Sequence, residues 1–511
     1  MTNTFSLFRS LVIYAICLPL AIWLGYLLAT PYNLRETILT VVIPLCLLSV
    51  PMLLRWHYPW MIACWNLDAI LFFIPGRPAF WTLLIGVSLL ISVLQYIMNR
   101  QLKFLSVPSI TKPLIFFAVV ILLTARLTGG IGINALGSGD NVGGRRYIWL
   151  LIAIMGYFAI TAQRIPIQKA RLYTTLFFIG FVSFAIGSSA GMLGQGLNFI
   201  YQIFPPDSTG YANVSQDAVS GPAAIARFGG LSTGALGITY LLLTRYGVEG
   251  VMRFGKIWRP LLCLVLLFIC LFGGYRSMAI NLLLTVSILF CLEGLLRSHY
   301  LPIVILCFVL GAAVMLPFAD KLPMSIQRSL TFLPIHLDPE AEQNAKGSTE
   351  WRLEMWREAL PLVPKYLILG KGYGMSLSEL NKITLPGGAS DSGGAALAGD
   401  YHNGPLSVII PFGIFGVIGF IWFLVAGGRV MYRNYKFGDP LLERINRFLL
   451  AYYLMKIIMF FTVFGSLYSD FVGFTGLVGL SVALNGGLRV PAAEPTPRPV
   501  LNKFKFASAA R

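Results

Sequence analysis

Long apolar runs alternate with short polar stretches along almost the whole chain. A transmembrane helix needs about 20 consecutive, predominantly apolar residues. With a window of that length, the pattern predicts fourteen membrane-spanning segments, a count that could differ by two. Segment 60–75 is short and carries Asp68, so a re-entrant stretch or one tucked inside the bundle is the alternative there. The predicted spans are 10–30, 37–54, 60–75, 80–98, 113–129, 147–163, 172–189, 227–244, 260–275, 277–295, 300–317, 404–428, 447–465 and 470–488.

The composition supports a membrane protein. Hydrophobic residues make up 57% and charged residues 12% of the 511 positions, which is far more apolar than a soluble domain. We therefore predict an all-α polytopic membrane protein of about 12 to 14 transmembrane helices. The net charge of +18 does not predict nucleic-acid binding, because basic residues of membrane proteins gather in cytoplasmic loops and meet anionic lipids there.

The distribution of lysine and arginine predicts the orientation of the chain. Basic residues are concentrated on one side of the predicted spans, which we assign to the cytoplasm by the positive-inside rule. The long loop 319–403 then lies outside, and it carries ten acidic residues against eight basic ones. The basic side carries Arg100, Lys103, Lys112, Arg164, Lys169, Arg171, Arg245, Arg253, Lys256, Arg259, Arg429, Arg433, Lys436 and the tail from Arg489 to Arg511.

The same pattern divides the chain into three regions. Residues 1–226 are predicted to form an N-terminal transmembrane bundle. Residues 227–488 are predicted to form the catalytic membrane region, including the external loop 319–403. Residues 489–511 are Pro-rich and then basic, which predicts a disordered cytoplasmic tail near anionic headgroups.

The predicted external loop contains a segment with the pattern of an amphipathic helix. Acidic residues recur at 350, 354 and 358, and Trp351, Met355 and Ala359 follow them by one position. Such a helix could simply lie on the membrane surface, with its tryptophans among the headgroups. Arg352 and Trp356 share a face, so we expect the guanidinium to stack on the indole.

A histidine stands at the end of the same loop. Asn403 or Gly404 can cap a helix that has Pro405 in its first turn, so His402 is predicted to lie at the outer end of a span. The positive helix end favours the neutral ring, which suits a general base. The alternative is a structural histidine. Earlier in the loop, Gly370 and Gly372 provide a backbone that could approach a ligand closely.

Three basic residues stand next to or within apolar runs. Arg276 lies in a short turn on the predicted outer face, where burial is costly unless the guanidinium meets an anion or a carboxylate. Arg227 opens a span on the same face. The alternative for both is that they reach lipid phosphates at the interface. Lys456 lies inside an apolar run and is expected to pair within the bundle.

Together these features resemble the O-antigen ligase family, a superfamily that includes O-antigen and exopolysaccharide polymerases and protein O-oligosaccharyltransferases. The family's arginine at the start of a span is similar to Arg276, with Ile280 where leucine is usual. Its Arg, three residues, Trp and Gly-x-Gly look like Arg352, Trp356, Gly370 and Gly372. Its His-Asn, nine residues and Gly-x-x-Gly look like His402, Asn403, Gly413 and Gly416.

The resemblance implies a GT-C-like helical bundle with one large periplasmic loop over a lipid-facing cavity, in the bacterial inner membrane. It also implies a reaction without metal or other cofactor on a glycan linked to a polyprenyl diphosphate. His402 would be the general base, because an acceptor hydroxyl must lose a proton as it attacks. Arg276 and Arg352, with Arg227 as a helper, would bind the diphosphate leaving group. Trp356, Gly370, Gly372, Asn403, Gly413 and Gly416 would support the site.

The predicted function is transfer of a glycan from undecaprenyl diphosphate to an acceptor at the periplasmic face. A lipid A core would make the protein a ligase, a growing glycan a polymerase, and a serine on a protein a protein O-glycosyltransferase. The ligase or polymerase is favoured. The alternatives from other classes are a lipid-linked oligosaccharide flippase or transporter, and a scaffold of an envelope complex. A transporter would carry charged residues near mid-membrane in paired broken helices, and a scaffold would need none of the candidate site residues.

Overall fold

The computed structural model describes residues 14, 17–19, 21–23, 25, 26, 51–74, 77–99, 104–129, 141, 142, 144–192, 195–205, 227–384 and 391–490. The predicted span 37–54 falls largely outside these residues, as does the predicted tail 489–511, and span 10–30 is described only in part.

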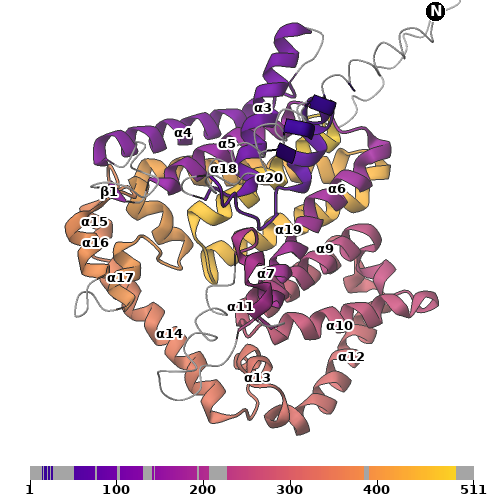
Figure 1. Ribbon diagram of the computed structural model, residues 1–511. Helices are drawn as coiled ribbons and strands as arrows, with labels where there is room; N and C mark the ends of the chain where they lie inside the picture. The colour runs from indigo at the N-terminus through magenta and orange to yellow at the C-terminus, as the bar shows by residue number, and fades with distance from the viewer. Residues whose placement is uncertain are drawn as a thin grey trace, which may run out of the picture.

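Helices dominate the described part of the chain (Figure 1). Two short strands, β1 (Asn141–Val142) and β2 (Met375–Ser376), pair antiparallel. Short 3₁₀ turns are η2 (Ile167–Lys169), η3 (Gly180–Val182), η4 (Gln195–Gln202), η5 (Phe254–Lys256), η6 (Leu295–Arg297), η7 (Leu316–Lys321) and η8 (Pro440–Leu442). The α-helices are 51–63, α3 (Phe80–Met98), α4 (Pro108–Thr128), α5 (Arg145–Thr161), α6 (Ala170–Ile179), α7 (Ser183–Met192), α9 (Gly229–Val251), α10 (Trp258–Phe272), α11 (Arg276–Leu292), α12 (Tyr300–Met315), α13 (Met324–Leu330), α14 (Pro339–Ala359), α15 (Leu362–Lys365), α16 (Leu377–Thr384), α17 (Asp391–Leu397), α18 (Gly404–Phe437), α19 (Glu443–Thr462) and α20 (Leu467–Asn485).

Seven helical segments of the described chain are long and apolar enough to cross a membrane. The predicted fold class, a helical multi-pass membrane protein, is therefore confirmed. The predicted number of 12 to 14 spans is not confirmed. Helices α10 and α11 are apolar but shorter. The seven segments are Phe80–Met98, Pro108–Thr128, Ile167–Ala190, Tyr300–Lys321, Gly404–Phe437, Pro440–Thr462 and Leu467–Asn485.

The predicted span 60–75 is wrong. The helix in this part of the chain covers 51–63, and the backbone then turns until Ile70 forms an isolated bridge with Ala79. Trp65 is almost fully buried, and its indole Nε1 donates to the carbonyl of Val472 in α20 over 3.1 Å. The first apolar residues of this segment, from Met61 to Trp65, thus pack inside the bundle, which is the alternative that Asp68 suggested, whereas Phe72 and Phe73 are exposed.

Helix α20 forms the centre of the bundle. It packs against α5 and α18, and α18 packs in turn against α4 (Figure 1). Gly476 and Gly479 lie where a side chain would meet Trp65 and Ile160 within 3.4 Å. Small residues at these positions let the neighbouring elements approach closely, as is usual between membrane helices.

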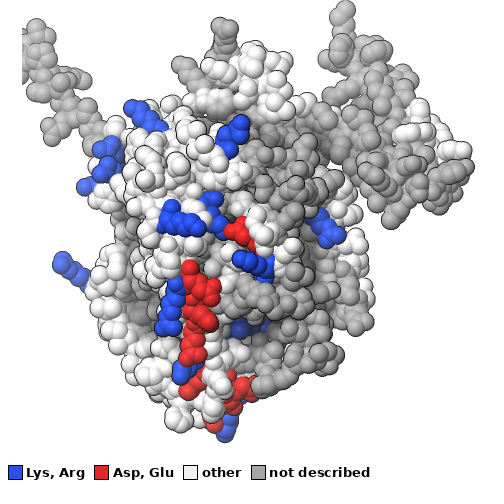
Figure 2. Space-filling model, turned by 90° about the vertical axis from the view of Figure 1, so that its left-hand side faces the viewer, with Lys and Arg blue, Asp and Glu red and all other residues white. Residues whose placement is uncertain are grey.

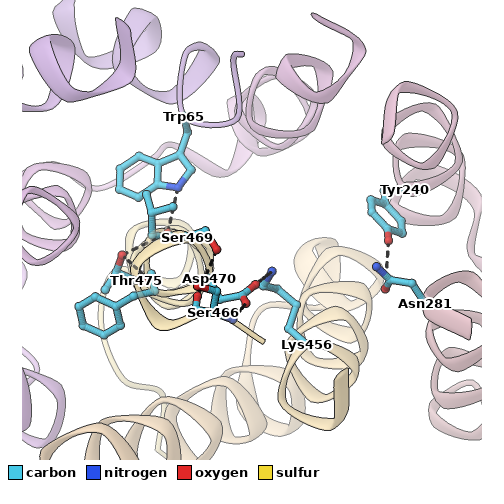
Figure 3. Close-up of polar contacts among 10 residues, drawn as sticks. Trp65, Tyr240, Asn281, Lys456, Ser466, Ser469, Asp470 and Thr475 are labelled. Atoms are coloured by element: carbon cyan, nitrogen blue, oxygen red, sulfur yellow. Dashed lines mark hydrogen bonds and ion pairs between the residues drawn. The ribbon is translucent and has the colours of Figure 1, made fainter. Parts of the chain in front are cut away.

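Lys456 of α19 forms the ion pair that its apolar surroundings predicted. Its Nζ lies 3.2 Å from Oδ1 of Asp470 in α20 (Figure 3). The other carboxylate oxygen of Asp470 accepts the backbone N–H of Ser466 over 3.0 Å. The pair therefore joins two core helices, and the expectation for Lys456 is confirmed.

Helix α12 has no buried residue although its sequence is apolar throughout. A helix that is apolar on all sides and stands apart from the core is suited to contact with lipid. It leads through η7 to α13 and then to α14, and these elements form the lower arch of the molecule in Figure 1. The arch carries part of the candidate site.

Candidate active site

Helix α14 has one charged face and one apolar face. Asp338 caps its start, because Oδ1 accepts the backbone N–H of Glu340 over 2.8 Å. Met355 and Ala359 are fully buried, whereas the acidic residues at 350, 354 and 358 are exposed. Acidic side chains form a band on the face shown in Figure 2. The predicted amphipathic helix is confirmed, and it covers Pro339–Ala359.

Four arginines from four different segments meet beside α14. Arg276 is the first residue of α11, and its Nη2 donates to the carbonyl of Ala345 over 3.1 Å and to Oγ1 of Thr349 over 2.9 Å. Arg227 precedes α9, and its Nη2 donates to Oδ1 of Asn344 over 3.2 Å. Both arginines are thus held against the helix that carries Arg352.

The fourth arginine, Arg328 of α13, was not predicted from the sequence. It is only 4% exposed, and it donates to Oδ1 of Asn344 over 2.7 Å, to Oγ of Ser348 over 2.9 Å and to the carbonyl of Gly274. Asn344 therefore accepts from both Arg227 and Arg328. In the sequence, Arg328 stands between a glutamine and a serine, and this polar setting does not indicate that its side chain is buried.

Burial and repulsion by neighbouring arginines lower the pKa values of Arg328 and Arg352. Burial lowers the pKa of Arg328 to about 10, and the charges of Arg227, Arg276 and Arg352 contribute to the shift. Burial, followed by the charges of Arg276 and Arg227, also lowers the pKa of Arg352. No ion pair recorded for the described residues includes any of the four. A cluster of partly desolvated guanidiniums without a carboxylate favours binding of an anion with several oxygens.

His402 lies just before α18, as predicted, with Asn403 as the cap. Oδ1 of Asn403 accepts the backbone N–H of Leu406 over 3.1 Å. His402 has a φ of 47°, a left-handed conformation that is unusual for histidine. Such backbone strain costs about 1–3 kcal/mol and is concentrated at functional sites.

The imidazole of His402 lies between two aromatic rings. Its centroid is 5.4 Å from that of Trp351 and 5.0 Å from that of Phe464. Nδ1 is buried without a hydrogen-bond partner and lies 3.8 Å from Oδ1 of Asp400, beyond hydrogen-bonding distance. Burial lowers the pKa of His402, Asp400 raises it, and Arg352 lowers it. The ring is therefore neutral at pH 7, the state that a general base requires.

Two contacts connect the histidine to the arginines. The guanidinium carbon of Arg352 lies 5.8 Å from the centroid of Phe464, whose ring also contacts His402. Indole Nε1 of Trp356 donates to the carbonyl of Tyr401, next to His402, over 2.8 Å. Phe464 is thus the cation–π partner recorded for Arg352, in place of the predicted Trp356, and Trp356 instead fixes α14 against the histidine segment.

The motif glycines join two parts of the backbone. Gly370 and Gly372 have positive φ, and so does Gly413 at a kink within α18. The backbone N–H of Lys371 donates to the carbonyl of Ile410 over 2.7 Å, and that of Gly372 donates to Pro411 over 3.0 Å. A side chain at Gly370 would meet the carbonyl oxygen of Pro411 at 2.1 Å. The sequence suggested that Gly370 and Gly372 approach a ligand closely. In the structure they approach the backbone of α18.

Gly416 lies one turn after the kink, where a side chain would meet the Cβ of Phe412 at 2.2 Å. Close packing at these glycines thus holds the loop that carries Gly370 and Gly372 against the kinked part of α18.

Replacing Gly370 with alanine is expected to lower the thermal unfolding midpoint of the purified protein by several degrees. The left-handed backbone disfavours a side chain, and the new Cβ would clash with a backbone atom of α18. Gly347→Ala is the matched control, since Gly347 lies in α14 and a Cβ there would have no atom within 4 Å. Equal midpoints for the two variants, measured in detergent by intrinsic fluorescence, would contradict this account of the loop.

The structure thus gathers the predicted site residues into two connected groups. Arg227, Arg276 and Arg352 lie together with Arg328, and His402 lies across the ring of Phe464 from Arg352. A family model described as O-antigen ligase matches residues 261–421, which include three of these arginines and the histidine. No curated protein matches the chain.

Proposed function

We propose that the protein transfers a glycan from undecaprenyl diphosphate to an acceptor hydroxyl, and the match of residues 261–421 to the O-antigen ligase family model supports this proposal. The family supports a glycan-transferring enzyme of the membrane. The donor, the acceptor, the inner-membrane location and the periplasmic side of the reaction are parts of the proposal. The observation that carries it is the cluster of four arginines, none of them in an ion pair within the described part of the chain, which Phe464 connects to a neutral histidine.

In the proposed reaction, the acceptor oxygen attacks the anomeric carbon of the lipid-linked sugar. The bond from that carbon to the diphosphate oxygen breaks, and undecaprenyl diphosphate leaves with the electron pair. The acceptor proton passes to the ring of His402, which is neutral and therefore able to receive it. Negative charge grows on the leaving diphosphate as the bond breaks. Guanidiniums that are already in place therefore stabilise the transition state, in which this charge develops, more than the ground state.

Each arginine has a distinct place in this proposal. Arg276 and Arg352 would contact the diphosphate, and Arg227 would assist from the start of α9. Arg328 is a positioning residue, because its three hydrogen bonds fix Asn344, Ser348 and the turn at Gly274 immediately before Arg276. It would also add positive potential from a buried position.

A transfer assay with purified protein determines which class of acceptor the protein uses. Purified protein is incubated with an undecaprenyl-diphosphate glycan and, separately, with lipid A core, a glycan chain or a serine-containing protein. We expect product with lipid A core or the glycan chain. Product with the protein alone would make the chain a protein O-glycosyltransferase of the same family, and no product with any acceptor would contradict the transferase.

The pH dependence of transfer follows from the pKa of His402. Because that pKa is lowered from the usual 6.5, the neutral base persists below this pH, and activity is lost only as the ring becomes protonated. We expect kcat/KM to fall on the acid side with a midpoint below 6.5. In Asp400→Asn the midpoint should move further towards acid, since Asp400 raises the pKa of His402. A midpoint at or above 6.5, or no acid limb, would contradict His402 as the base.

A further inference from the structure

A second arginine cluster lies at the other end of α9. Arg227 precedes the helix and Arg245 lies near its end, which separates the two residues by about 27 Å along the axis at about 1.5 Å per residue. Arg245 lines a pocket of about 320 Å³ together with Tyr246, Glu249, Gly250 and four other arginines, Arg171, Arg253, Arg259 and Arg444. The residues that line the pocket come from α6, α9, α10 and α19 and from the turn after α9, and α9 packs against the other three helices.

Positive charge in this pocket far exceeds negative charge. Among the lining residues that the structure describes, Glu249 is the one carboxylate, against five guanidiniums. None of these arginines takes part in an ion pair recorded for the described residues. Glu443, on the neighbouring wall, is paired with Arg447. This excess of positive charge makes the pocket suited to binding an external anion.

Arg259 is held in place while part of its donor capacity is unused. Its guanidinium carbon lies 3.8 Å from the centroid of the Tyr246 ring, and Nη1 donates to the carbonyl of Gly250 over 2.8 Å. Its Nε is buried and has no hydrogen-bond partner. A stacked and immobilised guanidinium loses little further entropy when it binds a phosphate oxygen.

An apolar groove continues from the arginine pocket. This hollow has a volume of about 740 Å³ and shares Arg171, Arg245, Tyr246 and Arg444 with the pocket. Its walls carry Leu172, Ile238, Leu241, Leu242, Trp258 and Leu441. Leu441 is 78% exposed and Leu172 is 55% exposed. A hydrocarbon chain lying in the groove would therefore cover apolar side chains that are otherwise exposed. A small soluble anion would leave this groove unfilled.

We propose that this pocket and groove bind one anionic phospholipid, with its phosphodiester among the arginines and an acyl chain along α6, α9 and α10. Basic pockets between membrane helices bind acidic headgroups in this manner. The site is separate from the candidate active site and does not depend on the proposed reaction. The bound lipid would join α9 and α10 to α19 at the end of the bundle opposite Arg227.

The test uses the full-length protein in neutral detergent. Binding of phosphatidylglycerol, phosphatidylcholine and inorganic phosphate is measured by native mass spectrometry and by the shift in thermal midpoint. We expect phosphatidylglycerol to be retained and to stabilise the protein, with little effect of the other two. Arg245→Gln/Arg259→Gln should weaken phosphatidylglycerol binding about 30-fold, since each basic residue near acidic lipid contributes about a factor of five.

Arg433→Gln is the control, because Arg433 is an exposed arginine of α18 that does not line the pocket. Arg444→Gln, an exposed single change, replaces the double variant if that variant does not fold, and it should weaken binding about fivefold. Equal binding of phosphatidylcholine, or unchanged phosphatidylglycerol binding in folded pocket variants, would overturn the proposal. Equally tight binding of inorganic phosphate would show an anion site without lipid specificity and would also overturn it.

Discussion

His402→Asn should lower kcat for glycan transfer by about 10²–10⁴-fold, the usual contribution of a general base. Asparagine cannot accept the acceptor proton at neutral pH, so the attacking hydroxyl would have to lose its proton to water. Arg227, Arg276 and Arg352 remain in place, and binding of the donor should therefore change little.

The choice of asparagine separates chemistry from folding. The φ of 47° at His402 is unfavourable for alanine, whereas asparagine tolerates the left-handed conformation. The thermal midpoint should therefore stay close to that of the wild type in His402→Asn and fall in His402→Ala. Near wild-type transfer by a folded His402→Asn protein would remove the proposed base.

Arg352→Gln should lower kcat by about 10²–10³-fold, the size of effect seen when one preorganised donor to a developing anion is removed. Arg352 lies between the other arginines, which lower its pKa, and the Phe464 ring that contacts His402. It is therefore the arginine best placed to contact both the diphosphate and the reacting sugar. Because the loss concerns the transition state, KM for the donor should rise much less than kcat falls.

The matched control for this arginine lies on the same helix. Arg357 of α14 is exposed and is not among the charges that shift the pKa of Arg352 or Arg328. Arg357→Gln should transfer at the wild-type rate, measured by initial rates at saturating donor. Equal losses in the two variants would mean that α14 acts through general positive charge, and the specific role of Arg352 would be wrong.

The sequence predicted much of the helical framework because apolar runs of sufficient length have few alternatives in a membrane. It failed at 60–75, where hydrophobicity signalled burial but did not separate a spanning helix from a turn packed around Trp65. It correctly predicted the pairing of Lys456 from the high cost of burying its charge alone. Local patterns also singled out Arg352 and His402, whose roles in the reaction stay predictions.

The remaining parts of the site depend on contacts between residues distant in sequence. Arg328 meets Gly274 and Asn344 through tertiary packing, and no local pattern announces that burial. Phe464 lies more than sixty positions from His402, and an aromatic residue within an apolar stretch carries no sign of such a role. The glycine motifs were recognisable, but only the structure shows that they contact the backbone of α18.

The most direct test of the account measures whether transfer and donor cleavage occur together. Purified wild-type protein in liposomes receives a labelled undecaprenyl-diphosphate glycan and an acceptor, and released undecaprenyl diphosphate is quantified beside glycosylated product. The account predicts the two in equal amounts, with both lost in His402→Asn. Movement of the intact lipid-linked glycan across the bilayer without cleavage would identify a transporter and contradict the account.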